Sequence, residues 1–406
     1  MSGEFVCLLA QSNQECVIMK TIIKNAKIIS DGKITEGKQV CIENGTITAI
    51  EPQNMEISGN VIDAGGQYLS AGFVDIHVHG GGGSDFMDGA EAYAAACESH
   101  LNHGTTSIVP TTISADFTQT LFAVEQFKAA KKNPDIRCNL LGLHLEGPYL
   151  NPAMAGAMRP EQLKAPCEKE FLKLWEASEG NIIRWTAAPE LEGGLEFGRK
   201  MAEFGVVMSI GHSDADFETV KKAYDNGYSM ITHLYSACSS IKRIGGFRHA
   251  GIVEAAYLLD DMRVEIIADG CHLPKELLNF VTKFKKTGTV ALITDAMRAS
   301  GQDVETSFLG SAECPQPVII EDGVAKLLDR QAFGGSIATT DRLVRTMVEA
   351  GTPLEKAVQM MTQTPVSFIC PNIKKGKIEV GYDADLILFN DHIDIQAIYL
   401  GGEKVK

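Results

Sequence analysis

Eight short apolar runs alternate with amphipathic stretches between residues 73 and 294 of this 406-residue chain. The runs are Phe73–Val78, Ser107–Thr112, Leu140–Leu145, Ile182–Ala187, Val206–Ile210, Met230–Thr232, Val264–Ala268 and Val290–Thr294. The amphipathic stretches include Ala90–His103, Thr118–Lys132, Glu161–Ala177, Ala215–Asn226 and Lys275–Lys286. Near-continuous hydrophobic strands separated by helices predict a parallel sheet that is covered on both faces. Eight such units within about 220 residues predict an α/β protein with a (β/α)8 TIM-like barrel.

Both ends of the chain have a different, β-rich pattern. The N-terminal strand candidates are Thr21–Ile29, Gln39–Glu43 and Thr46–Ile50, and the C-terminal ones are Gly376–Ile387 and Ala397–Val405. Asp31-Gly32 and Asn44-Gly45 are strong hairpin signals. The C-terminal segment could form an independent tail, but neither segment alone is large enough to bury a good core. We therefore predict one small β-sandwich domain built from both chain ends.

These patterns divide the chain into four parts. Residues 1–19 are expected to form a loose N-terminal extension, and residues 72–370 the catalytic barrel. Residues 20–71 and 371–406 would supply the two parts of the β-sandwich.

Charge and cysteine content exclude several classes of protein. The 37 basic and 52 acidic residues give a net charge of −15, which argues against a nucleic-acid partner. No stretch of about 18 apolar residues occurs, so no membrane-spanning segment is expected. The ten cysteines are scattered without a CxxC pair, which favours reduced thiols in a cytoplasmic protein.

Histidine and carboxylate residues recur at or just beyond the C-terminal ends of the predicted strands. They are His77, His79, His144, Glu146, His212, His233, His272 and Asp295. The C-terminal strand ends of a closed barrel converge on one mouth, and the strand period of two places His77 and His79 on the same side. We therefore predict a divalent metal site, without assigning His144 as a ligand. Imidazole and carboxylate ligands without thiolate suit zinc, or alternatively iron, manganese or cobalt.

The chain resembles the N-acetylglucosamine-6-phosphate deacetylase family of the amidohydrolase superfamily from about Lys20 to its end. The motifs that carry the resemblance are Gly72-Phe73-Val74-Asp75, His144-Leu145-Glu146-Gly147-Pro148-Tyr149-Leu150-Asn151, Gly211-His212-Ser213, Thr232-His233-Leu234-Tyr235, Ala268-Asp269-Gly270-Cys271-His272 and Ile293-Thr294-Asp295-Ala296. Many amidohydrolases use a carboxylated lysine where this chain has Glu146. The fourth strand region, Ile182 to Glu190, contains no lysine, which counts against dihydroorotase-like and hydantoinase-like relatives.

The resemblance implies a role for each matching residue. Glu146, His212 and His233 would hold the main metal ion, and His77 and His79 a second ion bridged through Glu146. Asp295 would be the general acid and base, and His272 would contact the substrate carbonyl and sugar. The implied contacts to sugar and phosphate are Ala157, Ser236, Ala237, Arg248, Gly334, Gly335 and Ser336. The implied substrate is an amino-sugar phosphate, and the implied assembly is a homodimer in which Arg248 reaches the partner subunit's site.

Two departures from the family pattern leave the substrate open. Ser236-Ala237-Cys238 stands where the family commonly has Asn-Ala-Met, and Gly156-Ala157-Met158 where it has Gly-Ala-His. The loop Ser239–His249 is longer and more basic. N-acetylgalactosamine 6-phosphate or another N-acyl compound therefore remains an alternative substrate.

Two broader alternatives also remain. The first is an amidohydrolase for cyclic amides or N-acyl amino acids, against which the basic loop and the lysine-free fourth strand argue. The second is a non-catalytic barrel with a structural metal, which would need neither Asp295 nor His272.

Overall fold

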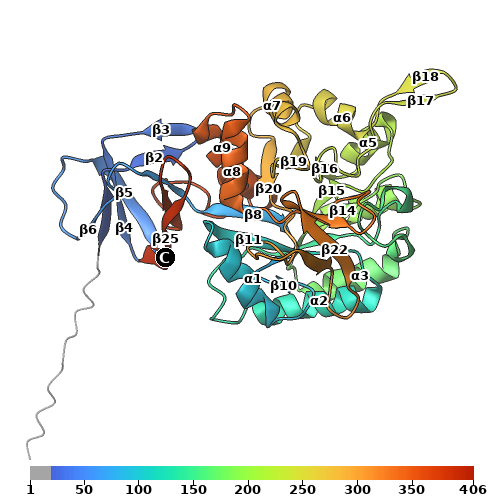
Figure 1. Cartoon of the computed structure of the whole chain (residues 1–406), viewed down its shortest axis with the longest axis horizontal. Helices are drawn as coiled ribbons and strands as arrows, with labels where there is room; N and C mark the ends of the chain where they lie inside the picture. The colour runs from blue at the N-terminus through green and yellow to red at the C-terminus, as the bar shows by residue number, and fades with distance from the viewer. Residues whose placement is uncertain (1–19) are drawn as a thin grey trace, which may run out of the picture.

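The computed structural model describes residues 20–406, so the prediction of an extension over residues 1–19 lies outside the described part. Its centre is a parallel barrel, which confirms the predicted fold class (Figure 1). The barrel strands, in hydrogen-bonded order, are β8 (Phe73–Val78), β11 (Thr105–Thr112), β13 (Leu143–Glu146), β14 (Ile182–Ala187), β15 (Val207–Ile210), β16 (Tyr228–Ile231), β19 (Arg263–Ile267) and β20 (Val290–Ile293). The short strand β12 (Asn139–Leu140) also pairs with β11, so the predicted run Leu140–Leu145 is interrupted.

Backbone hydrogen bonds bring the last barrel strand against the first. The amide of Asp295 donates to the carbonyl of His77 at 2.9 Å, and the amide of His79 donates to the carbonyl of Ala296 at 2.8 Å. These bonds lie just beyond the end of β20. They therefore hold the HxH pair and Asp295 in one fixed register.

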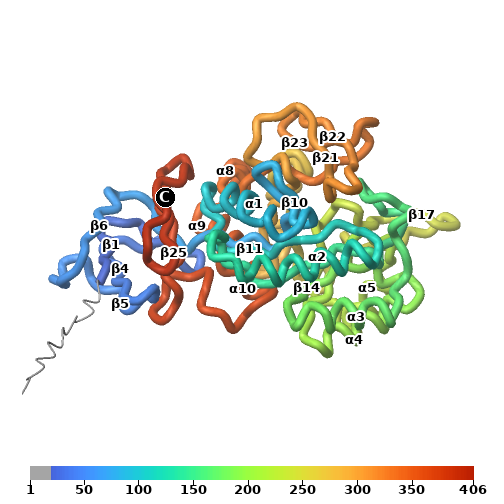
Figure 2. Tube along the Cα trace, turned by 90° about the horizontal axis from the view of Figure 1, so that it is seen from below, coloured from blue at the N-terminus to red at the C-terminus, as the bar shows by residue number. Residues whose placement is uncertain are grey.

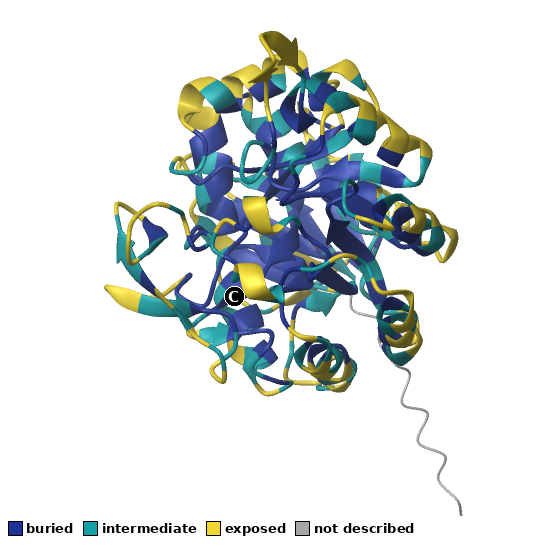
Figure 3. Ribbon diagram, turned by 90° about the vertical axis from the view of Figure 1, so that its right-hand side faces the viewer, coloured by how far each residue is buried: buried dark blue, intermediate teal, exposed yellow. Residues whose placement is uncertain are grey.

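Helices surround the barrel. They are α1 (Ala92–Leu101), α2 (Phe117–Ala130), α3 (Glu168–Ser178), α4 (Gly194–Glu203), α5 (Phe217–Asp225), α6 (Ile252–Leu258), α7 (Lys275–Phe284), α8 (Thr340–Glu349), α9 (Leu354–Met361) and α10 (Gln363–Ile369). Two short 3-10 turns, Pro152–Met154 and Pro160–Gln162, follow β13. Figure 3 shows the buried strands at the centre and the exposed outward faces of the helices around them. No helix within residues 20–406 is both long and apolar enough to cross a membrane.

A β-sandwich lies beside the barrel and contains strands from both chain ends, as predicted (Figure 1). One sheet has the order β5 (Thr46–Pro52), β4 (Lys38–Glu43), β1 (Thr21–Lys24) and β6 (Asn60–Asp63). The other has the order β26 (Glu403–Lys404), β25 (Ile395–Leu400), β24 (Leu386–Phe389), β7 (Tyr68–Ala71), β2 (Lys27–Ser30) and β3 (Lys33–Thr35). Apolar side chains from both sheets, such as Ile23, Val40, Leu69 and Leu386, form one buried cluster.

The two hairpin signals are confirmed, while some strand boundaries were wrong. Asp31-Gly32 and Asn44-Gly45 have positive φ values and connect β2 to β3 and β4 to β5. The predicted strand Thr21–Ile29 is two strands in different sheets, because Asn25 adopts a left-handed conformation with φ of 56°. The predicted strand Gly376–Ile387 begins only at Leu386.

Three antiparallel insertions were not predicted. They are the pair β9 (Gly80–Gly81) and β10 (Ser84–Asp85), the hairpin β17 (Lys242–Ile244) and β18 (Phe247–His249), and the sheet β21 (Thr306–Leu309), β22 (Gln316–Glu321) and β23 (Val324–Leu327). The β17–β18 hairpin projects from the barrel in Figure 1. In Figure 2 the β21–β23 sheet lies at one side of the barrel, away from the β-sandwich.

A hydrogen-bonded polar network runs between the barrel strands. Arg184 of β14 donates to Glu265 of β19, with Nη2 at 2.7 Å from Oε2, and to the hydroxyl of Thr232 at 3.0 Å. The Thr232 hydroxyl also contacts the hydroxyls of Thr186 at 2.8 Å and Ser209 at 2.6 Å. All five side chains are fully buried. Such barrels are ordinarily packed with branched apolar residues, so this polar network distinguishes the barrel.

Candidate metal centre and active site

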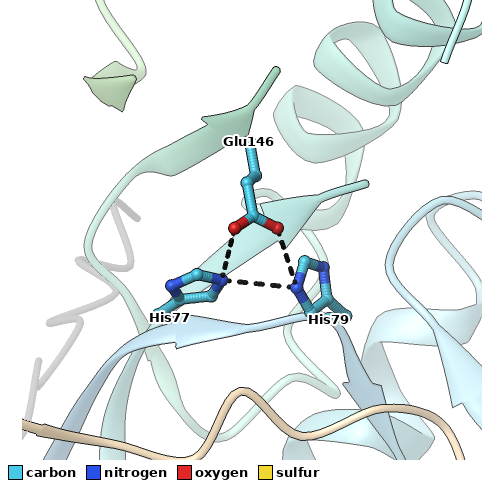
Figure 4. A group of neighbouring side chains, drawn as sticks. All are labelled: His77, His79 and Glu146. Carbon is cyan, nitrogen blue, oxygen red and sulfur yellow. Dashed lines mark hydrogen bonds and ion pairs between the residues drawn. The ribbon is translucent and has the colours of Figure 1, made fainter. Parts of the chain in front are cut away.

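The HxH pair of β8 faces the carboxylate of Glu146 at the end of β13 (Figure 4). Nε2 of His77 lies 3.6 Å from Oε1 of Glu146, and Nε2 of His79 lies 3.3 Å from Oε2. The two Nε2 atoms are 3.3 Å apart. The three side chains are buried and form one donor set.

A second donor set shares the same carboxylate. Nε2 of His212 lies 3.4 Å from Oε1 of Glu146, and Nε2 of His233 lies 3.0 Å from the same oxygen. These two Nε2 atoms are 3.2 Å apart. Glu146 therefore stands between two histidine pairs that come from three different segments of the barrel mouth.

The spacing of these donors fits a metal ion. Zinc bonds of about 2.0–2.1 Å at tetrahedral angles place neighbouring ligand atoms about 3.3 Å apart. Within each set, the potential ligand atoms lie within 4.8 Å of one another. The donors are imidazole nitrogen and carboxylate oxygen, which suit zinc and related divalent ions.

The other ring nitrogens orient two of these histidines. Nδ1 of His212 lies 2.9 Å from the carbonyl oxygen of Met154, and Nδ1 of His233 lies 3.1 Å from that of Ser236. A carbonyl oxygen can only accept, so each Nδ1 must carry the proton. Nε2 is then left with its lone pair for a metal, as is usual for histidine ligands.

Opposite charges stabilise one another in this buried site. Burial lowers the pKa of His77, but Glu146 and Asp295 outweigh it and raise the pKa to about 9. Burial raises the pKa of Glu146, but His77, His212 and His233 outweigh it and hold the pKa well below its ordinary value. The carboxylates of the site are therefore ionised and lie beside positive charge. A bound cation would stabilise the ionised carboxylates in the same way.

Asp295 lies directly beside the HxH pair. Its Oδ1 is 3.1 Å from Nε2 of His79 and 3.5 Å from Nε2 of His77. Burial raises the pKa of Asp295, but these two histidines outweigh it and lower the pKa to about 2. Asp295 is therefore ionised at neutral pH and able to accept a proton.

His272 is held by Asp269. Its Nδ1 lies 2.8 Å from Oδ2 of Asp269, while Oδ1 of Asp269 accepts the backbone amides of Cys271 and His272, both at 2.8 Å. The ring also contacts the edge of Phe333, with ring centroids 4.8 Å apart. This arrangement leaves Nε2 of His272 available to a bound molecule.

A cavity of about 390 Å3 is lined by His79, Glu146, His212, His233, Asp295 and His272, whereas His77 of the first donor set is not part of its wall. Its walls also include four of the residues predicted to contact substrate, namely Ala157, Ser236, Ala237 and Gly335. Gly334 and Ser336 do not line it, although the amide of Ser336 donates to the carbonyl of Asp295 at 2.8 Å. Arg248 does not line it either, because it lies on the exposed strand β18.

His144, which was not assigned as a ligand, lies outside both donor sets. Its Nδ1 contacts the hydroxyl of Thr111 at 3.1 Å, and its Nε2 contacts the hydroxyl of Thr186 at 2.7 Å. Burial and the nearby Arg184 lower the pKa of His144 well below its ordinary value. It is therefore a packed, neutral residue beneath the site.

The segment Arg330–Phe333 lines the cavity and was not predicted to do so. It follows the unpredicted β21–β23 sheet. The sequence did contain a turn signal for this sheet, Asp322-Gly323, which is the same dipeptide as in the confirmed β2–β3 turn. Both residues have positive φ values and connect β22 to β23.

Residues 68–405 match the model of the amidohydrolase family. The chain belongs to the amidohydrolase family. This confirms the resemblance inferred from the motifs; the amidohydrolase superfamily is metal-dependent, and the chain has His and Glu groups able to hold a metal ion.

Individual members with named activities are similar over nearly their whole length. The N-acetylglucosamine-6-phosphate deacetylase of Lysinibacillus sphaericus is 31% identical over 92% of this chain and 95% of its own. The N-acetylgalactosamine-6-phosphate deacetylase of a Shewanella species is 30% identical over 94% of this chain and 95% of its own. The crystal structure of N-acetylglucosamine-6-phosphate deacetylase from Pasteurella multocida has a TM-score of 0.86 at 29% identity, covering 95% of this chain and 99% of that one.

Proposed function

We propose that this amidohydrolase removes the acetyl group of N-acetyl-D-glucosamine 6-phosphate, giving D-glucosamine 6-phosphate and acetate in amino-sugar catabolism. The proposal depends most on one observation: two histidine pairs share the Glu146 carboxylate, and this carboxylate and Asp295 line one cavity. The names of the similar proteins support the substrate.

The metal ligands that we propose are Glu146, His212 and His233 for one ion, and His77 and His79 with Glu146 for a second. Zinc is the metal we favour, because the donors are nitrogen and oxygen without thiolate. When bound, such an ion acts as a Lewis acid that polarises the amide carbonyl and makes water more acidic.

Asp295 and His272 supply the remaining chemistry. The ionised Asp295 accepts a proton from the attacking water, whose oxygen forms the new bond to the carbonyl carbon. Asp295 then returns the proton to the amine nitrogen as the C–N bond breaks and its electrons move to that nitrogen. His272 is held by Asp269 through Nδ1, and in its doubly protonated imidazolium form it would also donate through Nε2 to the oxygen on which negative charge develops.

The galactosamine isomer is a second candidate substrate, because a relative named N-acetylgalactosamine-6-phosphate deacetylase is 30% identical. Ser236 and Met158 line the cavity at the positions where the chain departs from the family pattern. Side chains at these positions are suited to distinguish the two sugars, which differ in the orientation of one hydroxyl.

A homodimer is the assembly that we propose, with the β17–β18 hairpin at the interface. Ile244 and Phe247 of this hairpin are 59% and 76% exposed in the single chain. Large apolar side chains on a projecting hairpin are typical of a protein contact. The same hairpin carries Arg248, which this assembly would bring to the partner's cavity.

The cytoplasm is the compartment that we propose, because the eight cysteines within residues 20–406 are free thiols.

The test is acetate release from N-acetylglucosamine 6-phosphate, N-acetylgalactosamine 6-phosphate and the two unphosphorylated sugars. We expect the highest kcat/KM for N-acetylglucosamine 6-phosphate. A higher value for the galactosamine isomer would select the second candidate, and no release from any of the four would contradict the deacetylase proposal.

A further inference from the structure

The cavity wall within residues 20–406 contains a single Lys or Arg side chain, that of Arg330. A phosphorylated sugar carries close to two negative charges at neutral pH, and guanidinium groups bind phosphate through charge-assisted hydrogen bonds. The proposed metal ligands His79, Glu146, His212 and His233 line the same cavity. Arg330 is therefore the residue of this chain with the charge and the location to meet the phosphate.

Hydrogen bonds to Glu321 leave part of the Arg330 guanidinium free. Nε of Arg330 donates to Oε1 of Glu321 at 2.9 Å, and Nη2 of Arg330 donates to Oε2 of Glu321 at 3.3 Å. A guanidinium has five N–H donors, so these bonds leave both hydrogens of Nη1 and one of Nη2 for another acceptor. The Arg330 side chain is 59% exposed, which leaves this edge accessible.

Backbone hydrogen bonds fix the loop that carries Arg330. The amide of Arg330 donates to the carbonyl of Leu327 at 2.8 Å, and the amide of Leu327 donates to the carbonyl of Ala332 at 2.9 Å. Arg330 itself has a φ of 58°, a left-handed conformation that is costly for a residue with a side chain. Phe333 packs against His272 at the other end of the loop. The loop is thus attached to the active site.

Three other basic side chains are less suitable for binding the phosphate. Lys326 is held by Glu321 at 3.1 Å and by Asp322 at 2.5 Å, and it does not line the cavity. Arg243 and Arg248 lie on the β17–β18 hairpin and do not line the cavity of their own chain.

We propose that Arg330 binds the phosphate of the substrate within its own subunit, and that Glu321 is the positioning residue that orients the guanidinium. This inference rests on the proposed function, because it assumes a phosphorylated substrate. It assigns phosphate selectivity to the loop that follows the β21–β23 sheet as well as to the β17–β18 hairpin.

Replacing Arg330 with Ala tests the inference through the kinetics of two substrates. For N-acetylglucosamine 6-phosphate we expect kcat/KM to fall about tenfold to a hundredfold, mainly through KM, because a charge-assisted hydrogen bond is lost. For unphosphorylated N-acetylglucosamine we expect no change. Glu321→Gln should raise KM for the phosphorylated substrate alone, and should add nothing to Arg330→Ala in the double variant.

Arg199→Ala is the matched control, since Arg199 is likewise an exposed arginine paired with a carboxylate, but it lies on α4 and does not line the cavity. Equal effects of Arg330→Ala on both substrates, or no effect on either, would overturn the inference while leaving the deacetylase proposal intact.

A binding measurement keeps the test independent of turnover. Calorimetric titration with glucosamine 6-phosphate should show at least about tenfold weaker binding to Arg330→Ala than to the wild type or the Arg199→Ala control. Unchanged affinity would overturn the inference, even if the wild type released no acetate.

Discussion

Three residues among the proposed metal ligands and the proposed general base have backbone conformations that side-chain-bearing residues rarely adopt. The φ values are 47° for His212, 30° for His233 and 50° for Asp295. Each left-handed residue of this kind costs about 1–3 kcal/mol and persists where the surrounding structure fixes it. All three follow the ends of barrel strands, where the chain turns over the barrel mouth. The strain is the consequence of directing these side chains toward one point.

Asp295→Asn separates proton transfer from metal binding. The substitution keeps the size of the side chain but removes the group that accepts a proton. We expect kcat to fall by about 10²–10⁴-fold, while the metal content by plasma mass spectrometry equals that of the wild type. Glu146→Gln is the comparison, because it should lower metal content as well. An Asp295→Asn enzyme with wild-type kcat would contradict the assigned role.

At the scale of elements, the barrel was predictable because its strands are buried on both faces and read as near-continuous apolar runs. The histidines and carboxylates were predictable because strand ends in a barrel share one mouth. Strand Thr21–Ile29 was mispredicted because its break depends on the left-handed conformation of one residue, Asn25.

The β21–β23 sheet could not be predicted from local sequence patterns. Its strands are only half buried and contain Pro317, so their apolar pattern is weak. Their stability depends on pairing with one another, which a local pattern does not record. Arg330 was missed for this reason, since its place in the cavity follows from the sheet.

The β17–β18 hairpin carries the prediction about assembly. Replacing Ile244 and Phe247 together with Ser removes its two most apolar exposed side chains and should convert the proposed dimer to a monomer at micromolar concentration. Sedimentation velocity measures the change. Phe284→Ser, at a 55% exposed position on α7, serves as the control and should stay dimeric. Monomeric wild-type protein, or a double variant that remains dimeric, would count against the hairpin interface.

At the scale of the whole molecule, the buried polar network links the barrel to the metal centre. Glu265 accepts from Arg184, and its Oε2 lies 3.4 Å from Nδ1 of His77. Removing one partner of a buried ion pair leaves an uncompensated charge. The network therefore supports the fold and one donor set at the same time.

Glu265→Gln should lower the free energy of unfolding by about 3–5 kcal/mol, since Arg184 would keep its buried charge without a counter-charge. Denaturant titration followed by circular dichroism measures this. Glu196→Gln breaks an exposed ion pair with Arg199 on α4 and should leave the denaturant concentration at the midpoint of unfolding unchanged. Similar midpoints for the two variants would argue against a structural role for the buried pair.

Metal removal tests most directly whether acetamide hydrolysis depends on a divalent ion at the donor sets around Glu146. Protein dialysed against a chelator, with its metal content checked by plasma mass spectrometry, is assayed for acetate release from N-acetylglucosamine 6-phosphate before and after addition of zinc. We predict that the metal-free protein keeps its circular dichroism spectrum, releases no acetate above background, and regains activity when zinc is restored. Acetate release at an undiminished rate by verified metal-free protein would contradict the account.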